Sequence, residues 1–311
     1  MWSMTLTIIT LIASLALVVI GADKLVDGAS AIAKKIGISD FVIGLTIVGF
    51  GTSCPELVVS VTGALEGLSA VSVGNVIGSN IFNTLLILGL TAVLSPIAIT
   101  KQNRKTDIPI TIGVTALLCG LIIYGKISRI AGVIFLLLFT SYIILCFKQG
   151  QNTEPSYDKP MGTAASIFWT LFGLAGLIIG GKYFVNSSVA IAQSMGVSEK
   201  FIAITLLAGG TSLPELVTCI IASAKHKDQL ALGNILGSNV FNILLILGIS
   251  SVISPIDCSA INMVDTGVLM LSAVIILASA FTGRNNRIGR IDGAAMLLIE
   301  ASYFTYLAIT A

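Results

Sequence analysis

Two glutamates lie within long apolar segments of the sequence, where a carboxylate could bind a cation. Glu56 ends the run Gly-Thr-Ser-Cys-Pro-Glu, and Glu215 ends the run Gly-Thr-Ser-Leu-Pro-Glu. A charged side chain at the centre of a bilayer costs about 2.5–3.5 kcal/mol even on the lenient insertion scale. One alternative is a protonated carboxyl that forms a hydrogen bond between helices. The equivalent placement of the two residues in a polar motif favours a shared cation site.

Each glutamate directly follows a proline that interrupts helical hydrogen bonding. Pro55 and Pro214 have no N–H group to donate to the carbonyl four residues earlier. We therefore expect the two helices to break at Thr52–Ser53 and at Thr211–Ser212. Irregular backbone at membrane depth is tolerated only where it is buried in protein or lines a cavity. The freed carbonyls and the adjacent hydroxyl groups then become available as oxygen ligands.

A second repeated motif, Gly-Asn-x-x-Gly-Ser-Asn-x-Phe-Asn, supplies a polar stripe on a neighbouring helix. Its first asparagine, its serine and its last asparagine are spaced at i, i+4 and i+8, so they share one helix face. Glycines four residues apart allow a second helix to approach closely. We place the last asparagine of each motif nearest the glutamates, whereas the first could equally be a polar contact between helices. The stripes are Asn75, Ser79 and Asn83, and Asn234, Ser238 and Asn242.

The predicted pocket offers only hard oxygen ligands: two carboxylates, hydroxyl groups, amide oxygens and bare carbonyls. Such a set suits Ca²⁺, which takes 6–8 oxygens in flexible geometry, and also Na⁺, whereas Mg²⁺ demands a stricter octahedron. Two ionised glutamates balance the charge of one Ca²⁺. Without a cation they repel each other and favour protonation. An empty carrier would therefore be reluctant to switch, as coupled exchange requires, and low pH should inhibit transport.

Both motifs belong to an internal repeat. Residues 49–96 align with residues 208–255 at a constant offset of 159 without a gap, and 22 of the 48 positions are identical. The match weakens outside this block, although Gly21 and Gly180 keep the same offset, as do Gly37 and Gly196. The identities concentrate on polar residues, which lipid solvates poorly. Duplication of a stable bundle alone would not explain that distribution.

The elements that position these residues must be membrane helices. Apolar residues make up 55% of the 311-residue chain and charged residues 10%, and the mean hydropathy is +1.01. These values exclude a water-soluble enzyme and a disordered chain, and the long unbroken apolar runs exclude a β-barrel. No basic run indicates nucleic-acid binding, and the net charge is +2. Ten segments are long enough to span a bilayer: 3–21, 41–64, 70–94, 108–125, 129–147, 163–181, 201–224, 230–253, 264–282 and 290–310.

We predict an all-α integral membrane protein with ten transmembrane helices in two inverted five-helix repeats. The first repeat is 1–147, a cytoplasmic linker follows at 148–162, and the second repeat is 163–311. Because five is odd, the second repeat enters the membrane from the opposite face, and the matched motifs should meet near the midplane. We interpret the first apolar segment as a retained helix rather than a signal peptide, because no basic region precedes it.

The basic residues predict the orientation. Thirteen of the 17 lysines and arginines fall on the side opposite the amino terminus, which is therefore cytoplasmic, and both termini face outward. We expect His226, on the cytoplasmic side, to be a solvated surface residue. The five cysteines form no CxxC pair and read as small buried thiols rather than as metal ligands or disulfides. We expect a monomer in the lipid bilayer of the plasma (prokaryotic inner) membrane, with no cofactor, and leave the role of Glu300 open.

The doubled Gly-Thr-Ser-x-Pro-Glu and Gly-x-Ser-Asn-x-Phe-Asn motifs resemble those of sodium/calcium exchangers in the cation/calcium exchanger superfamily, above all the short prokaryotic members. The resemblance covers the whole chain in topology and is most specific over 49–96 and 208–255. It implies antiport of Na⁺ against Ca²⁺, with the first and sixth helices sliding across the other eight to alternate access.

The resemblance also implies the roles of individual residues. It assigns shared carboxylates of the Ca²⁺ and Na⁺ sites to Glu56 and Glu215. Asn83 and Asn242 complete the central position, and the backbone carbonyls of Thr52 and Thr211 flank the Ca²⁺ site. The Na⁺ sites are lined by the side-chain oxygens of Ser53, Ser212, Ser79 and Ser238 and by the backbone carbonyls of Gly49 and Ala208.

Departures from other branches narrow the expected activity. Some relatives have aspartate at the position of Asn242, and the potassium-dependent branch uses that acid, so Asn242 argues against K⁺ dependence. The short linker leaves no room for the regulatory insert of eukaryotic exchangers, and the Thr-Ser before Pro-Glu differs from the proton-coupled exchangers. H⁺/Ca²⁺ antiport and a cation channel remain alternatives. An intramembrane protease would need aspartates, and none lies in mid-span.

Overall fold

The chain folds into a bundle of long apolar helices. The structure, a computed structural model, describes residues 4–149, 161–196, 208–282 and 286–310. Within these ranges eight helices are long and apolar enough to cross a membrane, and a bent pair, Asp40–Thr52 with Cys54–Leu65, makes a ninth if it counts as one span. Large apolar side chains such as Ile12, Leu137 and Leu298 are exposed on the bundle surface, as expected where lipid is the solvent.

Apart from the longer first helix, the elements of the first half follow the predicted spans. They are α1 (Met4–Ile36), α2 (Asp40–Ile43), η1 (Gly44–Val48), α3 (Gly49–Thr52), α4 (Cys54–Leu65), α5 (Ser69–Phe82), η2 (Asn83–Leu88), α6 (Gly89–Leu94), β1 (Ile97–Ala98), η3 (Asn103–Asp107), α7 (Ile108–Tyr124), β2 (Lys126–Ile127) and α8 (Arg129–Gln149). The elements labelled η are short π-helical turns that continue neighbouring α-helices.

The second half repeats this order. It contains α9 (Thr163–Ser194), α11 (Ala208–Gly210), α12 (Leu213–Ala224), α13 (Asp228–Val240), η5 (Phe241–Ile246), α14 (Leu247–Ile253), β3 (Ile256–Asp257), α15 (Met263–Thr282), β4 (Arg287–Ile288) and α16 (Arg290–Thr310). Residues 201–207 of the predicted seventh span, and most of the predicted linker, lie outside the described residues. That span is therefore represented by α11 and by α12, a shorter apolar helix.

The two helices α1 and α9 are much longer than the predicted spans at 3–21 and 163–181. Each runs on for more than ten residues, and a glycine with positive φ follows it, Gly37 at +72° and Gly196 at +78°. The predicted first span ended at residue 21, because charged residues such as Asp23 and Asp27 follow the apolar run. They do not end α1, because ion pairs satisfy them at the edge of the bundle.

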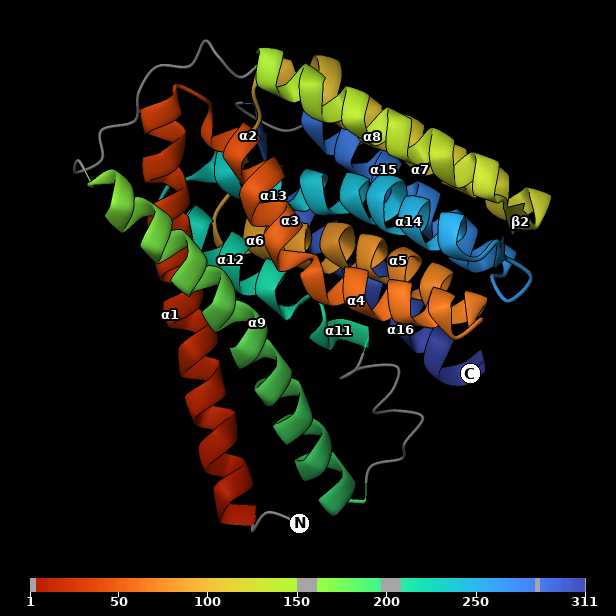
Figure 1. Ribbon diagram of the computed structural model, residues 1–311, viewed down its shortest axis with the longest axis horizontal. Helices are drawn as coiled ribbons and strands as arrows, with labels where there is room; N and C mark the ends of the chain where they lie inside the picture. Colours follow the sequence, from red (N-terminus) through yellow and green to blue (C-terminus); the bar gives the residue numbers. More distant parts are fainter. Residues whose placement is uncertain (1–3, 150–160, 197–207, 283–285, 311) are drawn as a thin grey trace.

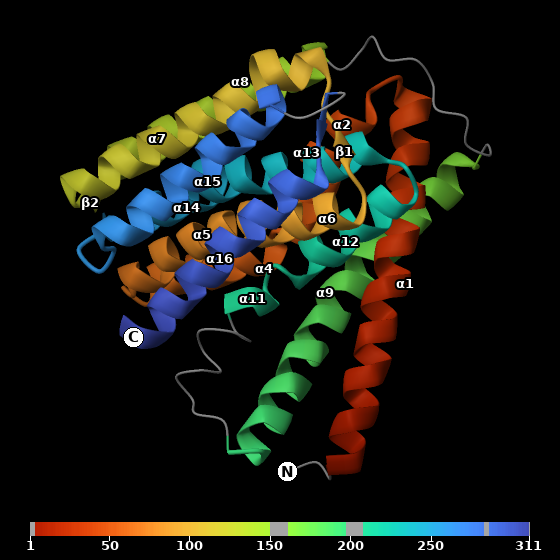
Figure 2. The same ribbon diagram turned by 180° about the vertical axis from the view of Figure 1, so that it is seen from behind.

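Glycines bring α1 and α9 into close contact. The two helices lie side by side and project together from the bundle formed by the others (Figures 1 and 2). A Cβ atom added at Gly21 would lie 2.9 Å from the carbonyl oxygen of Gly173, and one added at Gly180 would lie 3.0 Å from the carbonyl oxygen of Ser14. These two contacts are related by the same offset of 159. The glycines therefore allow the backbones to pack directly.

We expect the substitution Gly173→Ala to weaken this helix pair, because the new Cβ would lie 2.5 Å from the backbone nitrogen of Leu25. Overpacking of this kind costs about 1–3 kcal/mol. The apparent melting temperature of the purified protein should fall. Gly120→Ala in α7 is the matched control, since nothing lies within 4 Å of its added Cβ. Equal melting temperatures for the two variants would contradict tight α1–α9 packing.

Two short antiparallel ribbons connect the halves of the chain. Strand β1 pairs with β4, with Ile97 opposite Ile288, and β2 pairs with β3, with Ile127 opposite Ile256. Each ribbon therefore takes one strand from each half of the chain. Two-residue strands have no periodic pattern, so the sequence did not predict them.

The polar motifs lie on the most deeply buried helices. The spans Ala70–Leu94 and Asp228–Ile253, which contain α5 and α13, are the most enclosed of the eight candidate spans. The predicted helix break is present: α3 ends at Thr52, Ser53 departs from helical geometry, and α4 continues at an angle of 50°. In the second half, Ser212 has nearly the same conformation before α12. The expected surface position of His226 is confirmed, since its side chain is exposed.

Candidate cation-binding site

Each glutamate contacts the helix break of the other half. Ser53 Oγ donates a hydrogen bond to Glu215 Oε1 at 3.0 Å, and Ser212 Oγ donates one to Glu56 Oε1, also at 3.0 Å. Both carboxylates are 1% exposed. The proline breaks create this arrangement, because a straight helix would use Ser53 and Ser212 only within its own turn. The two acidic side chains are thus held together, one on either side of the contact between the halves.

Four oxygen atoms, one on each of the two glutamates and the two central asparagines, are buried without a hydrogen-bond partner among the described residues. They are Glu56 Oε2, Glu215 Oε2, Asn83 Oδ1 and Asn242 Oδ1. Leaving a buried acceptor unsatisfied costs about 1–3 kcal/mol, and more if it is charged, so four such atoms require an explanation. They form two pairs related by the offset of 159. All four are hard oxygen ligands, two of them carboxylate, which is what Ca²⁺ and Na⁺ prefer.

The amide groups of the central asparagines, Asn83 and Asn242, are each oriented by an asparagine of the other half. Asn83 Nδ2 donates to Asn239 Oδ1 at 3.3 Å, and Asn242 Nδ2 donates to Asn80 Oδ1 at 2.9 Å. Asn239 Nδ2 in turn donates to Thr84 Oγ1 at 2.9 Å. Because the nitrogen atoms of Asn83 and Asn242 are engaged in these bonds, their oxygen atoms are left free to bind a cation.

Two positioning residues, Asn80 and Asn239, were not among the predicted site residues. Asn80 Nδ2 donates to the backbone carbonyl of Asn239 at 3.1 Å, so these two asparagines link α5 directly to α13. Both recur at the same place in the repeated motif, next to Ser79 and Ser238. Their repetition was the available signal. Their helix face did not predict them, because they lie beside the polar stripe rather than on it.

The helices change geometry at the central asparagines. Asn83 is the first residue of η2, and Asn242 is the second residue of η5. Single π-helical turns of this kind often occur at functional sites, because the wider turn displaces a side chain from its α-helical direction. The sequence shows no proline or glycine at these positions, so this feature was not predictable from local composition.

The first asparagine of each stripe serves as a contact between helices. Asn75 Nδ2 donates to the carbonyl of Glu56 at 3.1 Å and to Ser60 Oγ at 2.9 Å. Asn234 Nδ2 donates to Cys219 Sγ at 3.2 Å, and its Oδ1 accepts a bond from Thr52 Oγ1 at 3.1 Å. The interpretation of these asparagines as polar helix–helix contacts, which the sequence left open, therefore holds for both.

The remaining predicted ligands are buried nearby. Ser79 is 2% exposed and Ser238 is fully buried, and Ser238 Oγ donates to the carbonyl of Gly49 at 3.5 Å. Thr211 Oγ1 is buried without a partner among the described residues. Ala208 begins α11, and only its backbone is described. The separate assignments of these residues to Na⁺ and to Ca²⁺ remain predictions.

The cysteines form no disulfide in the structure. All five are free, and four of them are buried. No group of three or more His, Cys, Asp or Glu side chains comes together within the described ranges. A cation bound between the two glutamates would therefore depend on neutral oxygens for the rest of its ligands. The fifth cysteine, Cys54, is half-buried next to Pro55.

One cavity of about 560 Å³ reaches the site, and we call it the access cavity. It lies between α4, α5, α9 and the α11–α12 break, and its lining includes Cys54, Asn75, Lys182 and Thr211. Two equivalent positions of the other half are enclosed instead. Thr52 and Asn234 are fully buried, whereas Thr211 and Asn75 are partly exposed. The two halves thus present the same residues in an open arrangement and in a closed one.

We expect Ser53→Ala and Ser212→Ala to weaken Ca²⁺ binding to similar extents. Each removes one hydrogen bond to a buried carboxylate, which is worth about 1.5–3 kcal/mol, so affinity should fall about ten- to a hundredfold. Isothermal titration with Ca²⁺ measures the effect. Because the two bonds have the same length, a large loss in only one variant would show that the two carboxylates are not equivalent in binding.

Comparison with known proteins gives one consistent result. A family model described as "Sodium/calcium exchanger protein" matches residues 6–148 and 165–310. The putative antiporter CaxA of Alkalimonas amylolytica is 38% identical over 313 residues, which cover 96% of this chain and 98% of that protein. The sodium/calcium exchanger MaX1 of Methanosarcina acetivorans is 31% identical, with coverage of 97% and 99%.

Solved structures agree with the sequence comparison. A structure of the sodium-calcium exchanger NCX_Mj, soaked with 10 mM Na⁺ and 10 mM Sr²⁺, superimposes with a TM-score of 0.87. It is 31% identical in sequence, and the match covers 97% of this chain and 99% of that one. The helical bundle described above is therefore shared with a membrane exchanger over nearly its whole length.

Proposed function

Because the chain belongs to the sodium/calcium exchanger family, and is thus an integral membrane cation/Ca²⁺ antiporter, we propose that it exchanges Na⁺ for Ca²⁺ at the site between Glu56 and Glu215. The observation that carries the proposal is the set of four unpartnered buried oxygens on these glutamates, Asn83 and Asn242. Two carboxylates and two amide oxygens match the charge and the ligand preference of Ca²⁺. Two Na⁺ ions would balance the same charge.

The proposal includes the ten-helix inverted topology and alternating access. The reciprocal bonds from Ser53 and Ser212 are what a twofold relation between the halves would produce. The access cavity supports exposure of the site to one side at a time, because Thr52 and Asn234, which are equivalent to the cavity-lining Thr211 and Asn75, are fully buried. We place both termini outside the cytoplasm, in accordance with the bias of lysine and arginine.

The decisive experiment measures Ca²⁺ uptake into proteoliposomes under an imposed Na⁺ gradient with pH clamped on both sides. Uptake should require Na⁺ inside the vesicle and should stop when choline replaces it. Ca²⁺ uptake that follows an imposed pH gradient and ignores Na⁺ would favour H⁺/Ca²⁺ antiport instead. Rapid Ca²⁺ flux that needs no counter-ion would indicate a channel.

Protons should compete with the transported cations. A carboxylate that binds Ca²⁺ must be ionised, so protonation of Glu56 or Glu215 removes a ligand and a charge together. We expect Na⁺-driven Ca²⁺ uptake to fall as the pH is lowered from 8 to 5, and higher Ca²⁺ concentrations should partly overcome the inhibition. Uptake assays with the same pH on both sides of the membrane measure this. A flat pH profile would contradict the involvement of the two carboxylates.

A further inference from the structure

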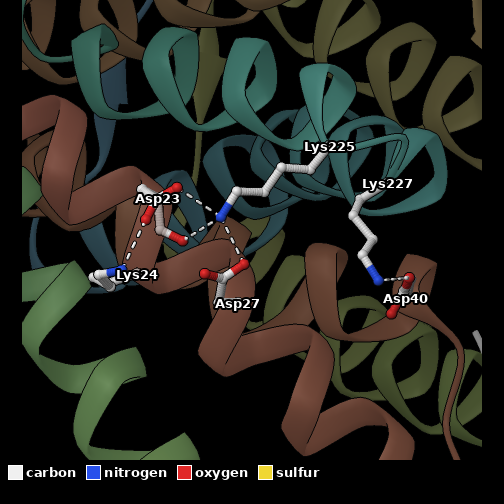
Figure 3. Close-up of polar contacts among 6 residues, drawn as sticks. All are labelled: Asp23, Lys24, Asp27, Asp40, Lys225 and Lys227. Atoms are coloured by element: carbon white, nitrogen blue, oxygen red, sulfur yellow. Dashed lines mark hydrogen bonds and ion pairs between the residues drawn. The ribbon is translucent and has the colours of Figure 1, made fainter. Parts of the chain in front are cut away.

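A lysine on the bundle holds α1 in place at one end of the molecule. Lys225, which directly follows α12, has its Nζ atom 2.7 Å from Asp23 Oδ1 and 2.6 Å from Asp27 Oδ1 (Figure 3). The two aspartates are one turn apart on α1 and bracket the ammonium group. Lys225 Nζ also donates to the carbonyl of Asp23 at 3.1 Å. This cluster joins the projecting helix pair to the remaining bundle.

The turn that carries Lys225 has an equivalent in the first half. Lys225 N donates to Ile221 O at 3.0 Å, and Glu66 N donates to Thr62 O at 3.0 Å. The next residue has positive φ in both turns, +57° at His226 and +74° at Gly67. Glu66 and Lys225 therefore occupy equivalent positions at the ends of α4 and α12, although their charges are opposite.

Of the two partner positions on α1 and α9, one is inverted in charge and the other changes from an acid to a neutral amide. At the offset of 159, Asp23 corresponds to Lys182 and Asp27 corresponds to Asn186. Lys182 and Asn186 are exposed and line the access cavity. In the part of the chain that the structure describes, neither Glu66 nor Lys182 forms an ion pair. The acid Glu66 follows α4 and the base Lys182 lies on α9, whereas the base Lys225 follows α12 and the acid Asp23 lies on α1. Of these two possible pairs, only Lys225 with Asp23 is in contact.

We propose that these are two alternating latches: Lys225 with Asp23 and Asp27 closes one face while the access cavity is open, and Glu66 with Lys182 closes the access cavity when the other face opens. The inference rests on the alternating access of the proposed function. It follows from the internal repeat, because exchanging the conformations of the two halves would place Lys182 beside Glu66 as Asp23 now lies beside Lys225.

The energetics suit a contact that is broken in every cycle. The three side chains of the closed latch are 26% to 39% exposed, so water and salt screen their attraction. An exposed ion pair contributes up to about 1 kcal/mol, which changes a population about fivefold. Each latch would thus bias the equilibrium between the two conformations without trapping either one.

Cys54 provides a direct readout of the equilibrium. It lines the access cavity and is the one cysteine that is not buried, so a membrane-impermeant thiol reagent should label it when the cavity is open. Lys225→Gln, or Asp23→Asn with Asp27→Asn, should lower the labelling rate about two- to fivefold. Glu66→Gln or Lys182→Gln should raise it. Lys227→Gln is the matched control, because its ion pair with Asp40 at 4.0 Å does not involve α1.

Cross-linking tests the open latch without relying on Cys54. In a variant whose five native cysteines are replaced, Glu66→Cys with Lys182→Cys should form a disulfide under mild oxidation, and this disulfide should stop Ca²⁺ uptake until it is reduced. Failure to cross-link, together with unchanged Cys54 labelling in the neutralised variants, would overturn the inference. The wild-type uptake assay separates this outcome from failure of the proposed function, which would abolish the Na⁺ dependence itself.

Discussion

Replacing either intramembrane glutamate with glutamine should abolish Na⁺-driven Ca²⁺ uptake while leaving a folded, membrane-inserted protein. Glu56→Gln and Glu215→Gln keep the shape of the side chain and an oxygen for the opposite serine, but each removes one of the two negative charges. Removing one member of a buried charge pair costs about 3–5 kcal/mol, which corresponds to a loss of about a hundredfold or more in affinity.

The control for this experiment is a third buried glutamate. Glu300 lies in α16, is 3% exposed, and has one carboxylate oxygen without a partner among the described residues, yet it belongs to neither repeated motif. Glu300→Gln should retain Ca²⁺ uptake close to the wild-type rate. Uptake by Glu56→Gln and Glu215→Gln within about threefold of wild type would place the transported ion elsewhere.

Much of the fold was predictable, because hydropathy and repetition are strong signals in a membrane protein. The described helices match the predicted spans except at α1 and α9, where charged residues continue the helix at the edge of the bundle. Hydropathy alone ended the first of these spans too early, since it cannot anticipate that Lys225, 202 positions from Asp23, would pair with Asp23 and Asp27.

The chemistry of the site was predictable to the level of residue types. Proline and glycine identified both helix breaks, and the repeat identified the glutamates and the central asparagines. The reciprocal serine–glutamate bonds were not foreseen, because they depend on how the halves dock. The roles of Asn80 and Asn239 were missed for the same reason, since tertiary hydrogen bonds decide which amide atoms remain free.

Adding a third carboxylate at the centre should change the ion requirement. Asn242→Asp would replace an unpartnered amide oxygen with a charged one, so that three negative charges face a Ca²⁺ ion with two positive charges. The surplus charge is costly in a dehydrated site unless another cation binds with Ca²⁺. We expect Ca²⁺ uptake at neutral pH to fall about tenfold without K⁺ and to recover partly when K⁺ is added.

The sign of the pH dependence separates this effect from simple damage to the site. In the wild type, protons only compete, so uptake falls as the pH is lowered. In Asn242→Asp, one bound proton neutralises the surplus charge, so uptake should rise at first as the pH is lowered from 8 and decline only at lower pH.

Asn242→Ser is the control, because it breaks the same bond to Asn80 Oδ1 without adding charge. It should lose activity with the pH and K⁺ profiles of the wild type. If Asn242→Asp kept those profiles too, Asn242 would not contact the transported ion, and the cation would be bound by the glutamates and hydroxyls alone.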